Sequence, residues 1–254
     1  MAITIKSERE IELMAEAGKI LERVHNELEK ALHPGMSTKD IDTLGEKIIR
    51  SYGCIPSFLN YNGYPASICV SVNQEVVHGI PDKHRIIQEG DIVSLDAGVI
   101  YKGYHSDAAR THAVGEVSEE AKKLIQVTKE SFFEGIKFAK AGNHLFDISG
   151  AIGRYAEERG YGVVRDLCGH GIGTALHEAP EIPNYEVGRK GVRLRPGMTL
   201  AIEPMINIGT YEVDWLDDDW TVVTRDGSLS AHYENTILIT EGEPRILSLT
   251  CENE

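Results

Sequence analysis

The chain has 254 residues, of which 41% are hydrophobic, and it carries a formal net charge of -14 at pH 7. Its length allows a large buried core, and its scattered basic residues argue against DNA as a partner, because a phosphate backbone selects clustered lysine and arginine. No signal peptide or apolar run long enough to span a membrane is visible. The cysteines include no Cys-x-x-Cys pair and suit a reducing compartment: Cys54, Cys69, Cys168 and Cys251. We therefore expect a cytoplasmic globular protein with no membrane partner.

The first elements in chain order are two helices and a hairpin. Ser7 and Glu10 form a capping-box pattern, and apolar residues at helical spacing then predict a helix over residues 8–31. A second helix begins at Ser37 or Thr38. The alternating segment "SICVSVN" predicts a strand, and "IVSLDAGVIYKGYHSDAART" (92–111) predicts two strands joined by a tight turn at Lys102-Gly103.

The second part of the chain repeats this order of helices followed by strands. Helices are predicted at 118–140 and 143–159, and strands after Tyr161 and at 198–206, 220–224 and 232–240.

A constant offset relates the two parts. Gly142 lies 107 residues after Gly35, and Glu203 lies 107 residues after Asp96, in the matching segments "PGMTLAIE" and "EGDIVSLD". We therefore predict an α+β fold formed by a single domain over residues 1–254. Its half-repeats, of about 1–112 and 113–254, would face each other across a pseudo-two-fold axis.

The hairpin carries two aspartates where a sheet should be apolar. With the turn at Lys102-Gly103, Asp96 lies opposite Ala109, and Asp107 becomes its diagonal neighbour on the same face. Two buried like charges repel each other and lose hydration, and a cation between them removes that cost. The alternative is a pair of exposed acids on an edge hairpin, with no ligand.

Three residues of the second half extend this candidate site. Glu203 ends one apolar strand, Glu234 begins another, and His170 lies among glycines in "CGHGIG". Taken alone, His170 is as easily a structural residue of a turn, and a phosphate loop is excluded here by the lack of a neighbouring Lys or Arg. Together with Asp96 and Asp107, these residues balance the charge of two divalent cations, and their oxygen and nitrogen atoms suit Mn, Fe, Co or Zn.

Five motifs in the same order resemble the type I methionine aminopeptidases of bacteria, which share the pita-bread fold with prolidases, aminopeptidase P and creatinase. The resemblance covers nearly the whole chain and rests on "NGYPASICVSVNQEVVHGIPD", "GDIVSLDAGVIYKGYHSDAART", "CGHGIGTALHEAP", "GMTLAIEPM" and "SLSAHYENTILIT". It implies two α+β halves around a curved antiparallel sheet. It also implies a metallohydrolase that removes the initiator methionine when the second residue is small, by attack of a hydroxide activated by two metal ions.

The resemblance also implies roles for individual residues. Asp96, Asp107, His170, Glu203 and Glu234 would bind the metals, with Glu203 also handling protons. His78 would contact the scissile peptide and His177 would steady the tetrahedral intermediate. The methionine pocket would be formed by Tyr61, Tyr64, Cys69 and Trp220, with Phe58 and Leu176 at its rim in place of the family's more usual cysteine and phenylalanine.

The expected partners are N-terminal methionyl peptides and nascent chains, met at the ribosome or free in solution, and the chain is expected to be a monomer. Its own Met1-Ala2 start would be a substrate of this kind. Two alternatives remain open at this point. One is a prolidase or aminopeptidase P, which shares the metal ligands, and the other is an inactive relative that binds peptides.

Overall fold

The computed structural model describes residues 2–249, so Met1 and Cys251, both named above, lie outside the described residues. The first two helices begin where their caps predict. Helix α1 (Glu8–Ala31) has a complete capping box between Ser7 and Glu10, and helix α2 (Thr38–Ser51) begins after the N-cap Ser37. Both bury their apolar faces against strands of the central sheet.

The central hairpin has the predicted register. Strand β4 (Ile92–Tyr101) and strand β5 (Tyr104–Ala113) are joined by Lys102-Gly103, two residues with positive φ, as a two-residue turn requires. Asp96 lies opposite Ala109, and both acids project from the same face. Helix α1 packs against the other face of both strands.

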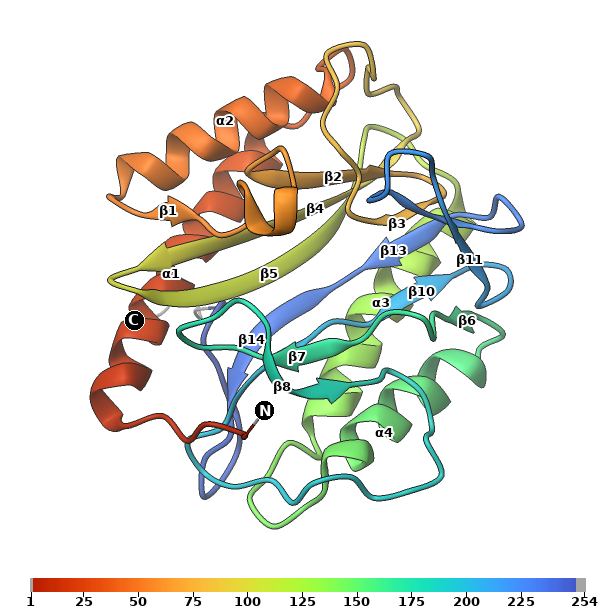
Figure 1. Cartoon of the computed structure of the whole chain (residues 1–254). Coiled ribbons are helices and arrows are strands. Elements are labelled where there is room, and N and C mark those ends of the chain that lie inside the picture. Colours follow the sequence, from red (N-terminus) through yellow and green to blue (C-terminus); the bar gives the residue numbers. More distant parts are fainter. Residues whose placement is uncertain (1, 250–254) are drawn as a thin grey trace.

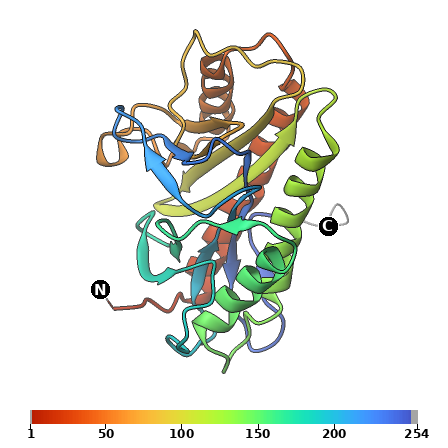
Figure 2. The same ribbon diagram turned by 90° about the vertical axis from the view of Figure 1, so that its right-hand side faces the viewer.

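The third and fourth helices are shorter than predicted. Helix α3 (Glu119–Ile136) ends four residues before residue 140, because the amides of residues 138 and 139 bond three residues back and tighten the last turn. Helix α4 (Leu145–Glu157) begins after His144, whose amide donates to Asp147. Figure 2 shows α3 along one side of the sheet, opposite the hairpin formed by β11 (Val213–Trp215) and β12 (Val222–Thr224).

A nine-stranded, antiparallel sheet joins the two parts of the described chain (Figure 1). At its centre β5 pairs with β14 (Glu234–Leu238), so that the predicted half-repeats meet there. The order runs β1-β4-β5-β14-β9-β7-β8, where the strands not yet defined are β1 (Ile55–Pro56), β9 (Thr199–Ile202), β7 (Gly169–Gly171) and β8 (Glu178–Ile182). Strand β2 (Ile68–Val72) also pairs with β4, and β15 (Arg245–Ile246) with β14.

Two strands predicted to be continuous are each divided into two in the structure, so these predictions are wrong. Segment 198–206 divides into β9 and β10 (Met205–Asn207), and segment 232–240 divides into β13 (Ser230–His232) and β14. The first break falls at Glu203-Pro204, where proline has no amide for the ladder, and the Tyr233 amide donates to the Pro204 carbonyl. β10 and β13 then join β6 (Gly162–Val163), the strand predicted after Tyr161, in a separate three-stranded sheet.

The remaining elements were not predicted as they occur. His170 lies in the short strand β7 rather than in a turn, because β8 and β9 pair with it on either side. The strand predicted from residue 220 begins only at Val222, since Asp218 binds the amides of Trp220 and Thr221. Strand β3 (Glu75–Val77) pairs with β12, and Tyr61–Gly63 form a single 3-10 turn. No helix among residues 2–249 is long and apolar enough to cross a membrane.

Candidate active site

All the predicted site residues line one cavity of about 180 Å³. The cavity opens between the two parts of the sheet and is acidic at one end and aromatic at the other. Its lining consists of Phe58, Tyr61, Asn62, Tyr64, Cys69, His78, Asp96, Asp107, His170, Leu176, His177, Glu203, Trp220 and Glu234. Asn62 is the one lining residue that sequence analysis did not select.

Strand register explains how acids from distant segments meet. Ala109 of β5 is paired with Asp96 on one neighbouring strand and with Glu234 on the other. Its side chain is fully buried and small, so the two longer acidic side chains lie on either side of it. Asp107 is two residues from Ala109 on the same strand and therefore faces the same side. Its amide donates to Thr236 Oγ1 at 2.9 Å, which fixes β5 against β14.

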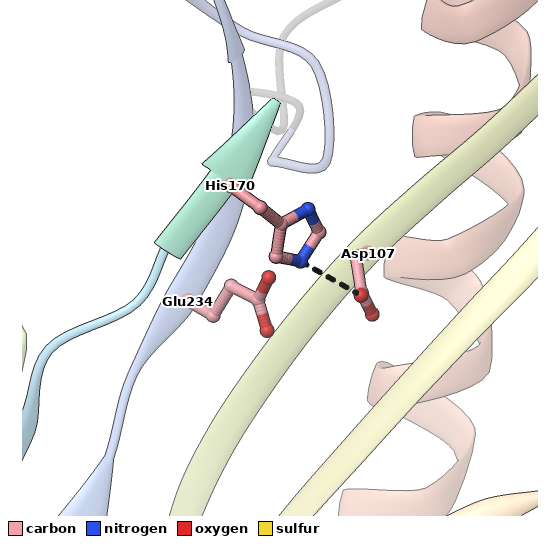
Figure 3. A group of neighbouring side chains, drawn as sticks. All are labelled: Asp107, His170 and Glu234. Carbon is pink, nitrogen blue, oxygen red and sulfur yellow. Dashed lines mark ion pairs between the residues drawn. The ribbon is translucent and has the colours of Figure 1, made fainter. Parts of the chain in front are cut away.

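Residues of β7 and β9 complete the acidic end. Figure 3 shows His170 pointing from β7 towards Asp107 and Glu234, and the potential ligand atoms of these three residues lie within 4.8 Å of one another. His170 Nε2 is 3.9 Å from Asp107 Oδ2 and 3.5 Å from Glu203 Oε1. His170 Nδ1 pairs with the Gly171 carbonyl at 2.9 Å, which leaves Nε2 directed at the acids.

The pKa values of all four carboxyl groups are raised, chiefly because the groups are buried. Burial, followed by repulsion from Asp107, raises the pKa of Asp96 and of Glu203 well above the usual values. Burial also raises the pKa of Asp107 to about 7, and burial and three neighbouring acids raise that of Glu234. The pKa of His170 is lowered to about 3 by burial, so its imidazole is neutral and offers a lone pair.

These side chains fit divalent metal ions. Asp96 Oδ1, Asp107 Oδ1 and Glu234 Oε1 are buried and have no hydrogen-bond partner within residues 2–249. Buried carboxylate oxygens need either a proton or a cation, and neutral imidazole with carboxylates is a donor set for Mn, Fe, Co or Zn. The geometry therefore supports a metal centre at this end of the cavity.

Two further histidines lie between the acids and the aromatic end. His177 Nδ1 pairs with the Tyr61 hydroxyl at 2.7 Å, and the rings of His177 and His170 are 4.2 Å apart. His78 has a φ of 60°, an unusual conformation for a residue other than glycine, and burial lowers its pKa to about 4. Both rings therefore face the cavity in neutral form, as donors or acceptors of one hydrogen bond at each nitrogen.

The aromatic end of the cavity is a largely apolar pocket. Tyr64 and Trp220 stack edge to face with ring centres 5.1 Å apart, and the buried Tyr64 hydroxyl is satisfied by the Gly79 carbonyl at 2.9 Å. Burial raises the pKa of the Cys69 thiol, which keeps it uncharged. Phe58 and Leu176 are also buried here, so they form part of the wall rather than an exposed rim. The pocket suits a flexible, unbranched apolar side chain.

Sequence analysis did not select His232, a buried residue whose ring lies close to two of the acids. Its Nε2 is 3.8 Å from Glu203 Oε2 and 3.9 Å from Glu234 Oε2, so that it forms a second group of potential metal-binding residues with them. The available signal was its position two residues before Glu234. Residues two apart in a strand share a face, so the predicted strand over 232–240 already placed His232 on the same side as Glu234.

Comparison with known proteins identifies the family of this chain. Residues 12–241 match the model of metallopeptidase family M24, and the chain belongs to that family. It has the family's pita-bread fold. It is 58% identical to a methionine aminopeptidase of Clostridium acetobutylicum, over 98% of this chain and 100% of the relative, and 52% identical to methionine aminopeptidase 1 of Bacillus subtilis, over 94% and 96%.

Solved structures of two kinds of peptidase share this fold but match the chain to different extents. The methionine aminopeptidase of Thermotoga maritima superposes with a TM-score of 0.96 at 47% identity, covering 98% of this chain and 100% of that one. An Xaa-Pro dipeptidase from Bacillus anthracis reaches a TM-score of 0.77 at 27% identity, and only 63% of its chain is covered. The protein is therefore a hydrolytic exopeptidase that matches the methionine aminopeptidases along their whole length and the prolidase only in part.

Proposed function

We propose that this protein removes the N-terminal methionine from peptides and nascent chains whose second residue is small. The observation that carries the proposal is one cavity in which a buried acid–histidine cluster meets a largely apolar pocket. The full-length similarity to methionine aminopeptidases supports it, whereas the prolidase alternative matches over part of the relative's length only.

Two divalent ions would be held by Asp96, Asp107, His170, Glu203 and Glu234. Four carboxylates balance the charge of two such ions, so bound cations would offset the cost of burying ionised acids and the repulsion between them. When bound, the ions would acidify a water molecule and polarise the scissile carbonyl.

The protein's own groups perform the remaining steps. Asp96 would hold the free amine of the N-terminal methionine. Glu203 would accept the proton of the attacking water and return it to the leaving nitrogen, as a carboxyl group with a raised pKa is suited to do. His177, oriented by the Tyr61 hydroxyl, would donate to the developing oxyanion, and His78 would contact the departing peptide nitrogen.

The pocket would select the methionine side chain. The thioether would lie against Tyr64, Trp220 and Cys69, with Phe58 and Leu176 closing the wall. The restriction to a small second residue would follow from the crowding of the site by His78 and His177 beyond the scissile bond. We also propose that the protein acts as a monomer in the cytoplasm, on chains met at the ribosome or free in solution.

The test is hydrolysis of Met-Ala-Ser, Lys-Ala-Ser and Ala-Pro-Ala by metal-stripped protein to which Mn, Fe, Co or Zn is added singly. We expect release of methionine alone, and only with metal. Hydrolysis of the prolyl peptide instead would establish the prolidase alternative. Metal binding without hydrolysis of any peptide would favour an inactive peptide-binding protein.

A further inference from the structure

His232 occupies a position for which the proposed reaction gives no role. It ends β13, is only 1% exposed, and both of its ring nitrogens lack a hydrogen-bond partner within residues 2–249. A buried polar atom without a partner costs about 1–3 kcal/mol. The two nearest candidate partners of Nε2 are Glu203 Oε2 at 3.8 Å and Glu234 Oε2 at 3.9 Å. These distances exceed a direct hydrogen bond by less than 1 Å, so a small movement of either carboxylate closes the gap.

The backbone of His232 is fixed relative to the acids. Its amide donates to Thr111 Oγ1 at 2.8 Å, and its carbonyl accepts from the same hydroxyl at 2.9 Å. Thr111 Oγ1 also pairs with Ser94 Oγ at 2.8 Å, on the strand that carries Asp96. These bonds fix the backbone of His232 against the two strands of the central hairpin, whereas the longer glutamate side chains can adjust to the ring.

A second cavity begins behind the ring. It encloses about 350 Å³ on the helix side of the sheet and is bordered by His232, His25, Arg110 and His112, among others. Arg110 donates from this side to the main-chain carbonyl of Glu234, and its other terminal nitrogen donates to Asn235 Oδ1 at 2.6 Å. Polar side chains, among them His25, Arg110 and His112, border this cavity, which has room for water molecules beside the ring.

We propose that His232 is a positioning residue that donates from Nε2 to the Glu203 and Glu234 carboxylates and orients them to bind metal. The inference rests on the metal centre of the proposed function and adds a residue to its support. An imidazole donor fixes which oxygen lone pairs of each carboxylate remain for the ions. Such supporting contacts are typically worth 10–100-fold in metal affinity.

The experiment measures Mn²⁺ affinity by titration calorimetry, and unfolding temperature in chelator, for His232→Leu and His232→Gln. The leucine variant keeps the bulk and loses the donor, whereas glutamine keeps an N–H. We expect His232→Leu to bind Mn²⁺ 10–100-fold more weakly and to melt in chelator at the wild-type temperature or above, because it removes a buried ring without partners. We expect His232→Gln to bind within about threefold of wild type, since it still donates to the carboxylates.

His25 provides a matched control. It is a buried histidine bordering the same second cavity, but its Nε2 already pairs with the Ala108 carbonyl at 2.8 Å. His25→Leu should therefore melt at a lower temperature and bind Mn²⁺ as wild type does. Wild-type affinity in His232→Leu, or a loss of affinity accompanied by a lower unfolding temperature in chelator, would overturn the positioning role. Failure of the wild-type protein to bind Mn²⁺ would instead refute the proposed metal centre itself.

Discussion

The acid cluster should make the metal-free protein less stable than a variant that lacks one of its charges. Asp107 is the acid to change, because it neighbours each of the other three and raises their pKa values. In the folded chain its own pKa is about 7, against 3.8 for an ordinary aspartate. The folded state therefore holds the proton more tightly than the unfolded state. The free energy of unfolding consequently falls as pH rises from about 4 to about 7.

The magnitude follows from the raised pKa of Asp107, which is caused by burial. The pKa difference corresponds to about 4 kcal/mol at pH 8, at roughly 1.36 kcal/mol per pH unit. We therefore expect Asp107→Asn to be more stable than wild type by about 3–4 kcal/mol at pH 8 in chelator. For a domain of this size that corresponds to about 10 °C in unfolding temperature.

The assay is differential scanning calorimetry in chelator at pH 4 and pH 8. Asp107→Asn should exceed wild type at pH 8 and match it at pH 4, while losing metal affinity at both. Asp42→Asn is the control: this buried aspartate accepts from the amides of Ser67 and Ile68 and pairs with Lys39, so its loss should lower stability at both pH values. Equal unfolding temperatures for wild type and Asp107→Asn at pH 8 would refute the electrostatic reasoning.

Three further outcomes are expected. Tyr61→Phe removes the hydroxyl that pairs with His177, so kcat for Met-Ala-Ser should fall about tenfold with the unfolding temperature unchanged; an unchanged kcat would exclude the orienting role. Lys6→Met leaves the largely buried Glu178 without its cation and should cost about 3 kcal/mol in urea unfolding, whereas Lys140→Met at an exposed pair should change it by less than about 1 kcal/mol. Adding Mn²⁺ to the wild-type protein should raise its unfolding temperature more at pH 8 than at pH 5, because protons compete with metal for the acids; an equal rise at both would contradict the proposed ligand set.

The features predicted correctly from sequence are those that depend on neighbours in the chain. Ser7 and Glu10 cap α1 as their spacing predicted, and Lys102-Gly103 sets a turn that fixes which residue faces Asp96. Once this register is known, the two acids of the hairpin must lie on one face. Glu203, Glu234 and His170 were selected from their places at strand ends and among glycines, although no local pattern shows that they meet the hairpin. The histidines His78 and His177 and the pocket residues were selected from the family resemblance alone.

The features that were missed depend on pairing between distant segments. Strand β7 has only three residues and is held by β8 and β9, so the glycine-rich sequence around His170 resembles a turn when it is considered alone. The breaks at Pro204 and Tyr233 transfer the chain from one sheet to another, and they are joined to each other by a hydrogen bond. His232 was missed although residues two apart in a regular strand share a face, so that its position before Glu234 already indicated its side.

These breaks also explain why the acids lie at this place in the fold. Glu203 follows the last paired residue of β9, so its side chain is not bound by the ladder's alternation, whereas Glu234 is held in register opposite Ala109. Glu203 directly follows β9 and Glu234 opens β14, so both lie at strand ends, while Asp96 and Asp107 lie within long, rigid strands. The hairpin thus supplies two aspartates with short side chains, and the second part of the chain supplies two glutamates whose longer side chains can adjust. Because the two glutamate side chains can move while the backbone of His232 is fixed, loss of His232 should weaken metal binding without lowering the stability of the fold.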